Sequence, residues 1–189
     1  MTTETCQDVR LAAAGDRTAY GRIVRAYGPK LAATLAAYGV ATGDVEDVVQ
    51  EAFIAGWRAL ADYDPDRPFK AWLFQIALNK ARDWRRKRQV RQFFHGAAPL
   101  EGSEAQALQT SDLSPEDAAH NRHLTERVSR AVQELPEDLK RAFVLTVVGE
   151  MTYAEASASL GVTPKSVEGR LMRARRLLQP KLATMRATN

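Results

Sequence analysis

The chain has 189 residues, enough for one large or two small domains, and its 45% hydrophobic and 26% charged residues exclude a wholly disordered protein. The net charge of +4 and the pI near 9.4 are only moderately basic, but the charges are segregated. Seven basic residues and one acidic residue lie between Lys80 and Arg91, whereas five acidic residues and no Lys or Arg lie between Gly96 and Ala119. Such segregation favours a polyanionic partner.

Cys6 is the only cysteine, which excludes an intrachain disulfide and a cysteine metal cluster and is consistent with a reducing cytoplasm. His95, His120 and His123 are not arranged as metal ligands. No apolar run approaches the roughly 20 residues that span a bilayer, and the N-terminus lacks a basic region followed by an apolar one. The sequence therefore predicts a soluble, cytoplasmic protein with no membrane insertion, no metal site and no cofactor.

The N-terminal residues up to Ala14 predict a short helix, and Gly15-Asp16 predicts a turn that caps the next helix. Pro29 lies inside that second helix, where it removes one backbone hydrogen bond and favours a kink or a split. Gly39 ends the pattern. The apolar residues that define this helix recur at helical spacing over about five turns; they are Tyr20, Ile23, Val24, Tyr27, Leu31, Leu35 and Tyr38.

The segment from Asp44 to Leu60 predicts an amphipathic helix with one acidic face. Its carboxylates complement the positive end of the helix dipole, which is a sufficient structural reason for them. A clustered carboxylate surface also suits docking of a basic protein partner. The apolar face of this helix is continuous and consists of Val45, Val48, Val49, Ala52, Phe53, Gly56, Trp57 and Leu60.

Residues Ala61 to Pro68 have the Asp and Pro content of an ordered loop, and a long helix follows from Phe69. A polar, cationic ridge on this helix can contact phosphates and unpaired bases. The alternative is a solvated helix face, and for Arg85 to Arg88 the two interpretations weigh equally. The core-facing residues are Phe69, Trp72, Leu73, Ile76, Ala77 and Trp84. The ridge consists of Gln75, Asn79, Arg82 and Arg86, spaced i, i+4, i+7, i+11.

Residues Gly96 to Ser114 lack periodicity and are rich in Gly, Ser, Ala and acids, which predicts a linker. Helix restarts at Ser114-Pro115-Glu116 and runs to Pro136. Leu139 to Val148 is apolar almost all round and predicts a buried helix on which the last two helices pack. The apolar residues before Pro136 are Leu124, Val128, Ala131, Val132 and Leu135.

The stretch from Gly149 to Leu178 predicts a helix, a tight turn and a second helix. Thr152 and Glu155 have the spacing of a capping box, and Gly161 ends the first helix. Thr163 caps the second helix and Pro164 suits its first turn. The apolar face of the first helix consists of Tyr153, Ala156, Ser157 and Leu160. In the second helix Val167, Leu171, Ala174 and Leu178 form the apolar stripe, and Lys165, Gly169, Met172, Arg173 and Arg176 lie opposite.

This pattern matches a helix-turn-helix, whose second helix enters the major groove of DNA. The alternative is a solvated helical hairpin whose arginines only keep it soluble. Gly169 favours the DNA-binding interpretation, because a glycine in an exposed helix interior costs about 1 kcal/mol relative to Ala. A partner that must approach the backbone closely would explain it, although neutral drift is a second explanation.

Three motifs of the chain resemble the bacterial extracytoplasmic-function sigma factors, the small group of the sigma-70 family. The motifs are DVEDVVQEAFIAGWRAL, RPFKAWLFQIALNKARDWRRKR and LPEDLKRAFVLTVVGEMTYAEASASLGVTPKSVEGRLMRARRLL. The resemblance implies an all-α protein of two small helical domains. Region two would cover residues 1–95, a flexible acidic linker residues 96–114, and region four, with the helix-turn-helix, residues 115–189.

The resemblance also implies binding roles for individual residues. The residues expected to dock on the clamp helices of the polymerase beta-prime subunit are Asp47, Gln50, Glu51 and Phe53. The residues expected to melt and read the minus-ten element are Asn79, Arg82, Asp83 and Arg86, with the loop Asp62 to Phe69. The residues expected to read the minus-thirty-five element are Lys165, Ser166, Glu168, Arg170 and Arg173. Region four would also meet the beta flap.

One departure concerns the upstream element. Many members carry Gly-Thr-Val-Lys-Ser-Arg where this chain has Lys165 to Arg170, KSVEGR, so the usual upstream element is not assumed. The Val-Glu-Gly-Arg variant resembles members tied to metal-resistance systems.

The residues and the resemblance together predict a protein that directs core RNA polymerase to promoter DNA, performs no catalysis, and is controlled by an anti-sigma factor. Two other classes stay open at this point. One is a helix-turn-helix regulator that binds DNA without polymerase, and the other is an adaptor or decoy that binds only protein.

Overall fold

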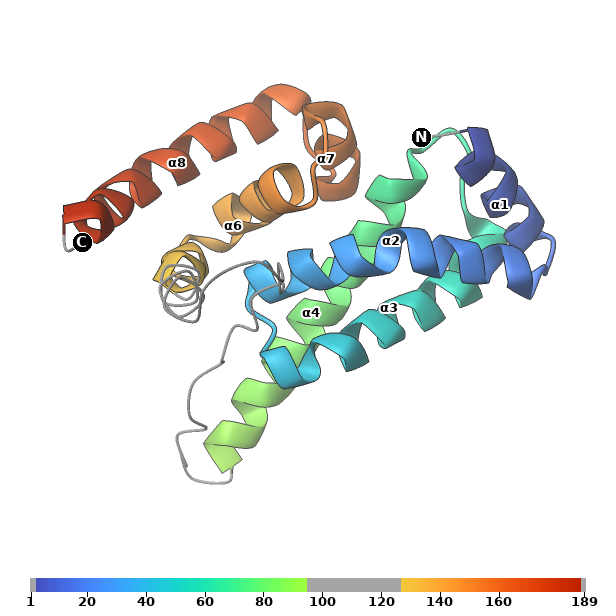
Figure 1. Cartoon of the computed structure of the whole chain (residues 1–189), viewed down its shortest axis with the longest axis horizontal. Helices are drawn as coiled ribbons and strands as arrows, with labels where there is room; N and C mark the ends of the chain where they lie inside the picture. Colours follow the sequence, from blue (N-terminus) through green and yellow to red (C-terminus); the bar gives the residue numbers. More distant parts are fainter. Residues whose placement is uncertain (1–2, 95–126, 188–189) are drawn as a thin grey trace, which may run out of the picture.

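The computed structural model describes residues 3–94 and 127–187, and within these ranges every regular element is helical. The predicted all-α class is therefore confirmed. Figure 1 shows the N-terminal helices α1 to α4 as one group and the C-terminal helices α6 to α8 as a second group beside them. The helices of the first group are α1 (Thr3–Ala13), α2 (Arg17–Tyr38), α3 (Val45–Ala59) and α4 (Phe69–Phe94), with short 3-10 turns at Thr42–Asp44 and Leu60–Asp62.

The second group begins with helical residues 127–133. The predicted linker and the restart of helix at Ser114 lie outside the described ranges. None of the described helices is both long and apolar enough to cross a membrane. The named elements of this group are α6 (Glu137–Phe143), the π-helical turn η3 (Val144–Val148), α7 (Tyr153–Leu160) and α8 (Pro164–Ala187).

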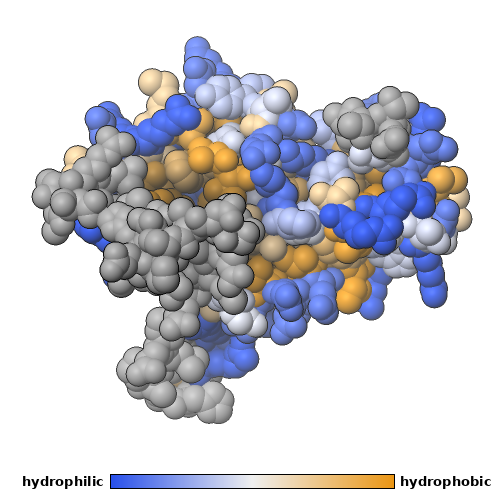
Figure 2. Space-filling model, viewed as in Figure 1, coloured by the Kyte–Doolittle hydropathy of each residue, from blue (hydrophilic) through white to orange (hydrophobic). Residues whose placement is uncertain are grey.

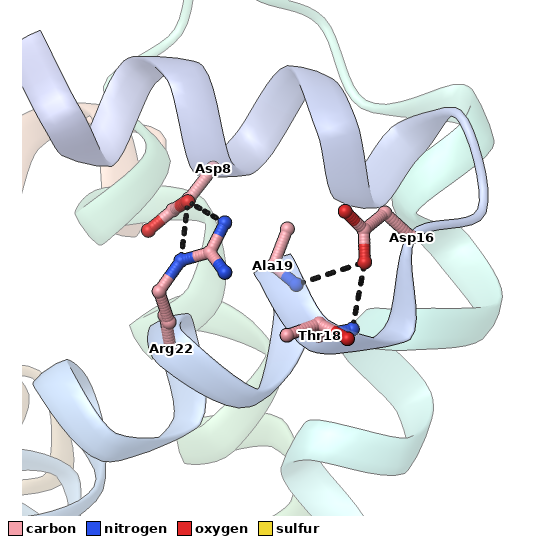
Figure 3. A network of polar contacts seen from close by, with 5 residues as sticks. All are labelled: Asp8, Asp16, Thr18, Ala19 and Arg22. Atoms are coloured by element: carbon pink, nitrogen blue, oxygen red, sulfur yellow. Dashed lines mark hydrogen bonds and ion pairs between the residues drawn. The ribbon is translucent and has the colours of Figure 1, made fainter.

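The joint between α1 and α2 is built from two carboxylates (Figure 3). Asp16 caps α2, as predicted, because its Oδ1 accepts hydrogen bonds from the backbone N–H groups of Thr18 at 2.8 Å and Ala19 at 3.1 Å. Asp8 of α1 accepts two hydrogen bonds from the Arg22 guanidinium, at 2.8 and 2.6 Å. These contacts fix the angle at which α1 lies on α2.

Pro29 does not split the second helix, contrary to the sequence-based prediction. Helix α2 runs without a break from Arg17 to Tyr38. Proline removes a single N–H donor, whereas Ile23 before it and Leu31 after it are buried in the core. Packing on both sides therefore keeps the helix continuous through Pro29.

One contact that holds the first group together lies between α2 and α3. The Tyr20 hydroxyl donates a hydrogen bond to the Phe53 carbonyl oxygen at 2.5 Å, and the Tyr20 ring meets the Trp57 ring edge-on at 4.9 Å between centroids. A Cβ on Gly56 would lie 3.0 Å from that hydroxyl oxygen, so the small residue permits the approach. Burial raises the pKa of Tyr20 to about 12.

The apolar stretch from Leu139 to Val148 is not the uniformly buried helix that its composition predicts. It changes from α-helix to a wider π-turn at Val144, where the Gly149 N–H donates to the Val144 carbonyl oxygen at 2.8 Å. Val144 and Leu145 at the start of this turn stay buried, whereas Val147 is 45% exposed. Gly149 has no room for a side chain, since a Cβ would lie 2.6 Å from the Leu145 carbonyl oxygen.

Candidate nucleic-acid and partner interfaces

The helix-turn-helix forms as predicted. The Thr152 hydroxyl accepts from the Glu155 N–H at 3.2 Å, and the Glu155 carboxylate accepts from the Thr152 N–H at 2.9 Å. Gly161 ends α7 in the left-handed conformation with φ 67°. The Thr163 hydroxyl then accepts from the Ser166 N–H at 3.2 Å, which starts α8 within a few residues.

The two faces of α8 separate as the periodicity predicts. The stripe of Val167, Leu171, Ala174 and Leu178 is buried. On the opposite face Lys165, Glu168 and Arg173 are exposed. Lys165 and Arg173, whose Nε also donates to the Gly169 carbonyl oxygen at 3.3 Å, can meet a base edge or a phosphate, and the Glu168 carboxylate can accept from a base.

Two of the predicted reading residues lie on the flank of α8 and not on its outer face. Arg170 is half-buried, and its Nε is 3.8 Å from a carboxylate oxygen of Asp138 in α6. Ser166 is half-buried in the first turn. Because each residue turns about 100° around a helix, neighbours of the buried Val167 and Leu171 point partly toward the domain. These two side chains therefore support the helix more than they face outward.

The outer face of α8 also carries a gap and a large apolar side chain. No atom lies within 4 Å of the Cβ position of Gly169, so packing inside the described chain does not require a glycine there. Met172, one turn further on, is 65% exposed. An exposed apolar side chain beside an open backbone suits contact with a thymine methyl group in the major groove.

The first helix of the motif differs from its predicted pattern at one end. Tyr153 was expected on the apolar face but is exposed, while Ala156, Ser157 and Ser159 are buried. Small side chains are buried here because α7 packs closely against both α4 and α8.

The loop before α4 is ordered around an aromatic cluster. The Tyr63 hydroxyl donates to the Arg67 carbonyl oxygen, and the Asp66 N–H donates to Asp64 Oδ1 at 2.9 Å. The Tyr63 ring lies 5.0 Å from the ring of Trp72. Tyr63 was not singled out from the sequence, although an aromatic residue within an Asp- and Pro-rich loop was the available signal.

The minus-ten residues proposed from the resemblance lie along α4. Arg82 and Arg86 are exposed, while Asn79 and Asp83 are half-buried. Two exposed cations thus lie beside two half-buried polar side chains on this helix. Such a surface can combine phosphate contacts with hydrogen bonds to a base.

The basic run from Arg85 to Arg88 divides between two environments. The Arg85 guanidinium donates to Glu137 Oε2 at 3.2 Å and lies 5.6 Å from the centre of the Tyr38 ring. Arg88 lies 3.8 Å from an Asp44 carboxylate oxygen and 5.3 Å from the Trp84 ring centre. Arg86, between them, is exposed. Neither of the two sequence-based interpretations therefore fits the whole run.

The acidic face of α3 presents three of the four predicted docking residues. Asp47, Gln50 and Glu51 are exposed. Phe53 is only 6% exposed, so its prediction as a docking side chain is corrected: it packs against Tyr20 in the core. Its neighbour Ile54 is 51% exposed, on the side of α3 that carries Asp47, Gln50 and Glu51. Figure 2 shows hydrophobic surface in the region of α3 with hydrophilic side chains around it.

Among residues 3–94 and 127–187, no group of three or more His, Cys, Asp or Glu side chains is placed to hold a metal ion. His95, His120 and His123, which are not expected to bind metal, lie outside these ranges. What the described residues do offer is an acidic docking face, a cationic ridge with an aromatic loop, and a helix-turn-helix. These features are the ones expected of an all-helical protein that binds nucleic acid and docks on a protein partner.

Two family models match the chain: Sigma-70 region 2 over residues 23–91, and Sigma-70, region 4 over residues 125–178. The RNA polymerase sigma factor CnrH of Cupriavidus metallidurans is 43% identical over 172 residues, 90% of each chain. The ECF RNA polymerase sigma-E factor of Escherichia coli is 33% identical over 170 residues, 89% of this chain and 88% of that one. The chain therefore belongs to the extracytoplasmic-function sigma factors of the sigma-70 family, which direct core RNA polymerase to promoters.

Solved structures agree with this assignment. CnrH in complex with the cytosolic domain of CnrY matches with a TM-score of 0.72 and 34% identity, over 96% of this chain and 99% of that one. The sigma factor RpoE of Bartonella quintana, in complex with the anti-sigma factor NepR, shares the fold with a TM-score of 0.69 and 22% identity, over 87% of this chain and 96% of that one.

Proposed function

We propose that this sigma factor divides its work between three parts: region two within residues 1–95, a linker at residues 96–114, and region four within residues 115–189. Region two docks on polymerase and opens DNA, and region four reads the upstream element. The observation that carries the proposal is the separation of three exposed surfaces, an acidic face on α3, a cationic ridge on α4 and a cationic outer face on α8.

The docking surface consists of Asp47, Gln50 and Glu51 with the exposed Ile54 beside them. An apolar side chain surrounded by carboxylates has the composition of a small protein interface, in which burial adds affinity and charge adds specificity. Its partner is the clamp-helix region of the beta-prime subunit, and region four contacts the beta flap.

The DNA-reading residues are Asn79, Arg82, Asp83 and Arg86 on α4 and Lys165, Glu168 and Arg173 on the outer face of α8. Ser166 and Arg170 support the upstream contact from its flank. All of these residues act by binding, and the protein performs no catalysis. The work takes place in the cytoplasm, where polymerase and promoter DNA are found.

A protein partner that holds the factor inactive is part of the proposal. It is supported by the solved complex of CnrH with the cytosolic domain of CnrY. A pull-down from resting cells should recover a stoichiometric anti-sigma factor together with the chain. Repeated recovery of core polymerase alone would count against this regulator.

The decisive experiment combines the purified chain, core polymerase and a library of promoter fragments. New transcription start sites that depend on the chain are expected. A regulator that works without polymerase would bind DNA in the same library but create no start sites, and a protein-only adaptor would do neither.

A further inference from the structure

The first turns of α8 present two opposite charges that do not pair with each other. Lys165 and Glu168 are both exposed and stand three residues apart, a spacing at which side chains on a helix surface are neighbours. Within residues 3–94 and 127–187, neither side chain takes part in an ion pair. A cation and a carboxylate placed side by side in this way offer a donor and an acceptor to the same ligand.

Gly169 leaves open space beside these two side chains. It directly follows Glu168 and lies one turn beyond Lys165 on the outer face. A Cβ at Gly169 would have no atom of the described chain within 4 Å, and its backbone is not among the glycines with positive φ. Neither packing nor backbone conformation requires a glycine here, although glycine destabilises a helix interior relative to alanine. A partner that approaches the backbone closely supplies the missing reason.

The neighbouring arginines are held elsewhere. Arg170 turns toward α6, where its Nε is 3.8 Å from a carboxylate oxygen of Asp138. Arg173 lies further along the helix, and its Nε donates to the Gly169 carbonyl oxygen at 3.3 Å. The two unpaired charges are therefore the charged groups nearest the N-terminal end of the outer face. In a helix-turn-helix this end of the second helix meets the base edges.

The chemistry of the major groove selects the base pair that fits these two charges. A carboxylate is repelled by phosphates, so on a DNA-facing surface it needs a donor, and the groove offers only cytosine N4 and adenine N6. Adenine N6 lies between two acceptors, N7 of the same base and O4 of the paired thymine, which repel a carboxylate. Cytosine N4 lies at the end of its pattern, and the paired guanine offers O6 and N7 to a cation. A cytosine–guanine pair is thus complementary to a carboxylate beside an ammonium group.

We propose that Lys165 and Glu168 together read one cytosine–guanine base pair of the upstream element, and that Gly169 provides the clearance for both. Glu168 accepts from cytosine N4, and Lys165 donates to guanine O6 or N7. The inference rests on the proposed role of α8 as the reader of the upstream element. Because the two charges cancel, this pair contributes base selection and little of the salt-dependent attraction to phosphates.

The test uses holoenzyme assembled from the full-length chain and core polymerase, on a promoter library with a randomised upstream element, and sequences the transcripts. The wild type should favour cytosine at one position by about fivefold, the lower end of the discrimination that a base-edge contact gives. Glu168→Gln should lose this preference and favour adenine at the same position, because a side-chain amide pairs with adenine N6 and N7. A change of preferred base cannot arise from misfolding.

Two further variants test the other residues. Lys165→Met should lower the preference at that same position, since both side chains read one pair. Gly169→Ala should raise the melting temperature, because alanine favours helix and meets no neighbour in the described chain, yet it should reduce the preference for cytosine. The matched control is Glu134→Gln, which makes the same chemical change in region four. Glu134 pairs with Lys181 near the other end of α8, so this control should keep the wild-type preference.

Loss of the cytosine preference in Glu168→Gln supports the assignment, and a gain of adenine supports it further. The inference is overturned if the wild type transcribes the library without favouring cytosine at any position, if Glu168→Gln keeps the wild-type preference, or if the control shifts it equally. An effect of Lys165→Met confined to another position would overturn the shared base pair, and an unchanged preference in Gly169→Ala would overturn the clearance. Failure of the proposed function appears separately, as wild-type protein that creates no start sites with core enzyme.

Discussion

Reversing the charge on the acidic face of α3 should abolish docking on core polymerase and leave the fold intact. The double variant Asp47→Lys, Glu51→Lys changes two exposed carboxylates one turn apart, on the side of the helix opposite the buried Val48 and Ala52. Among the described residues, neither carboxylate takes part in an ion pair. The substitution therefore breaks no ion pair within the described residues.

The expected cost in stability is small. Asp47 lies in the first turn of α3, where replacing a negative with a positive charge costs about 0.3 to 1 kcal/mol through the helix dipole. Repulsion between the two positions is the same for two lysines as for two carboxylates. A loss of about 1 kcal/mol lowers the melting temperature of a domain of about 95 residues by about 4 to 8 °C.

The expected cost in docking is larger. Coupling energies of close charge pairs across an interface start at about 1.5 kcal/mol each. Two reversals therefore weaken binding to core by at least about 3 kcal/mol, which is more than a hundredfold in Kd. The neutral variant Asp47→Asn, Glu51→Gln removes attraction without adding repulsion and should lose less.

Circular dichroism would check the fold, and titration with labelled core polymerase at fixed salt would measure docking. Wild-type affinity should also fall as salt is raised, because exposed charges are screened. A folded double variant that binds core as tightly as the wild type would remove this face from the docking role.

Three further predictions concern the other surfaces and the core. Arg173→Ala and Lys165→Ala should each weaken duplex binding at the upstream element by about 1 to 3 kcal/mol at fixed salt; unchanged affinity in both would exclude this face of α8 from reading. Asn79→Ala should leave the closed complex nearly as abundant in a gel shift but reduce permanganate-reactive thymines, and a premelted bubble should rescue it; equal loss of both complexes without rescue would leave the ridge a phosphate anchor. Tyr20→Phe should cost about 1 kcal/mol in denaturant unfolding. Because the pKa of Tyr20 is raised from 10.0 to about 12, its contribution is present below pH 10 and is lost as the pH rises toward 12, so the variant should show a shallower alkaline decline.

Signals that act over a few residues were read correctly from the sequence. Asp16 and Thr152 cap helices, and Gly39 and Gly161 end them, because each group is satisfied by backbone atoms within the adjoining turn. The buried stripe of α8 follows from periodicity alone. These local rules account for the helical elements and for the helix-turn-helix.

Burial within an element was predicted less well. Phe53 was expected to dock on a partner, yet Ile54, its neighbour, is the exposed side chain. Val147 was expected inside, yet it is exposed in the π-turn at η3. Both outcomes depend on which other helices pack against the segment, and that information is not contained in the spacing of its own residues.

The sequence by itself determined the helices, their caps, the helix-turn-helix and, through three motifs, the family. Only the tertiary structure decided that Lys30 meets Glu150, 120 residues away, and that Tyr38 meets Glu137, 99 residues away. Periodicity and capping reflect interactions within one or two helical turns. Pairs this distant exist because two groups of helices pack on one another, and complementarity between their surfaces leaves no periodic signal in the chain.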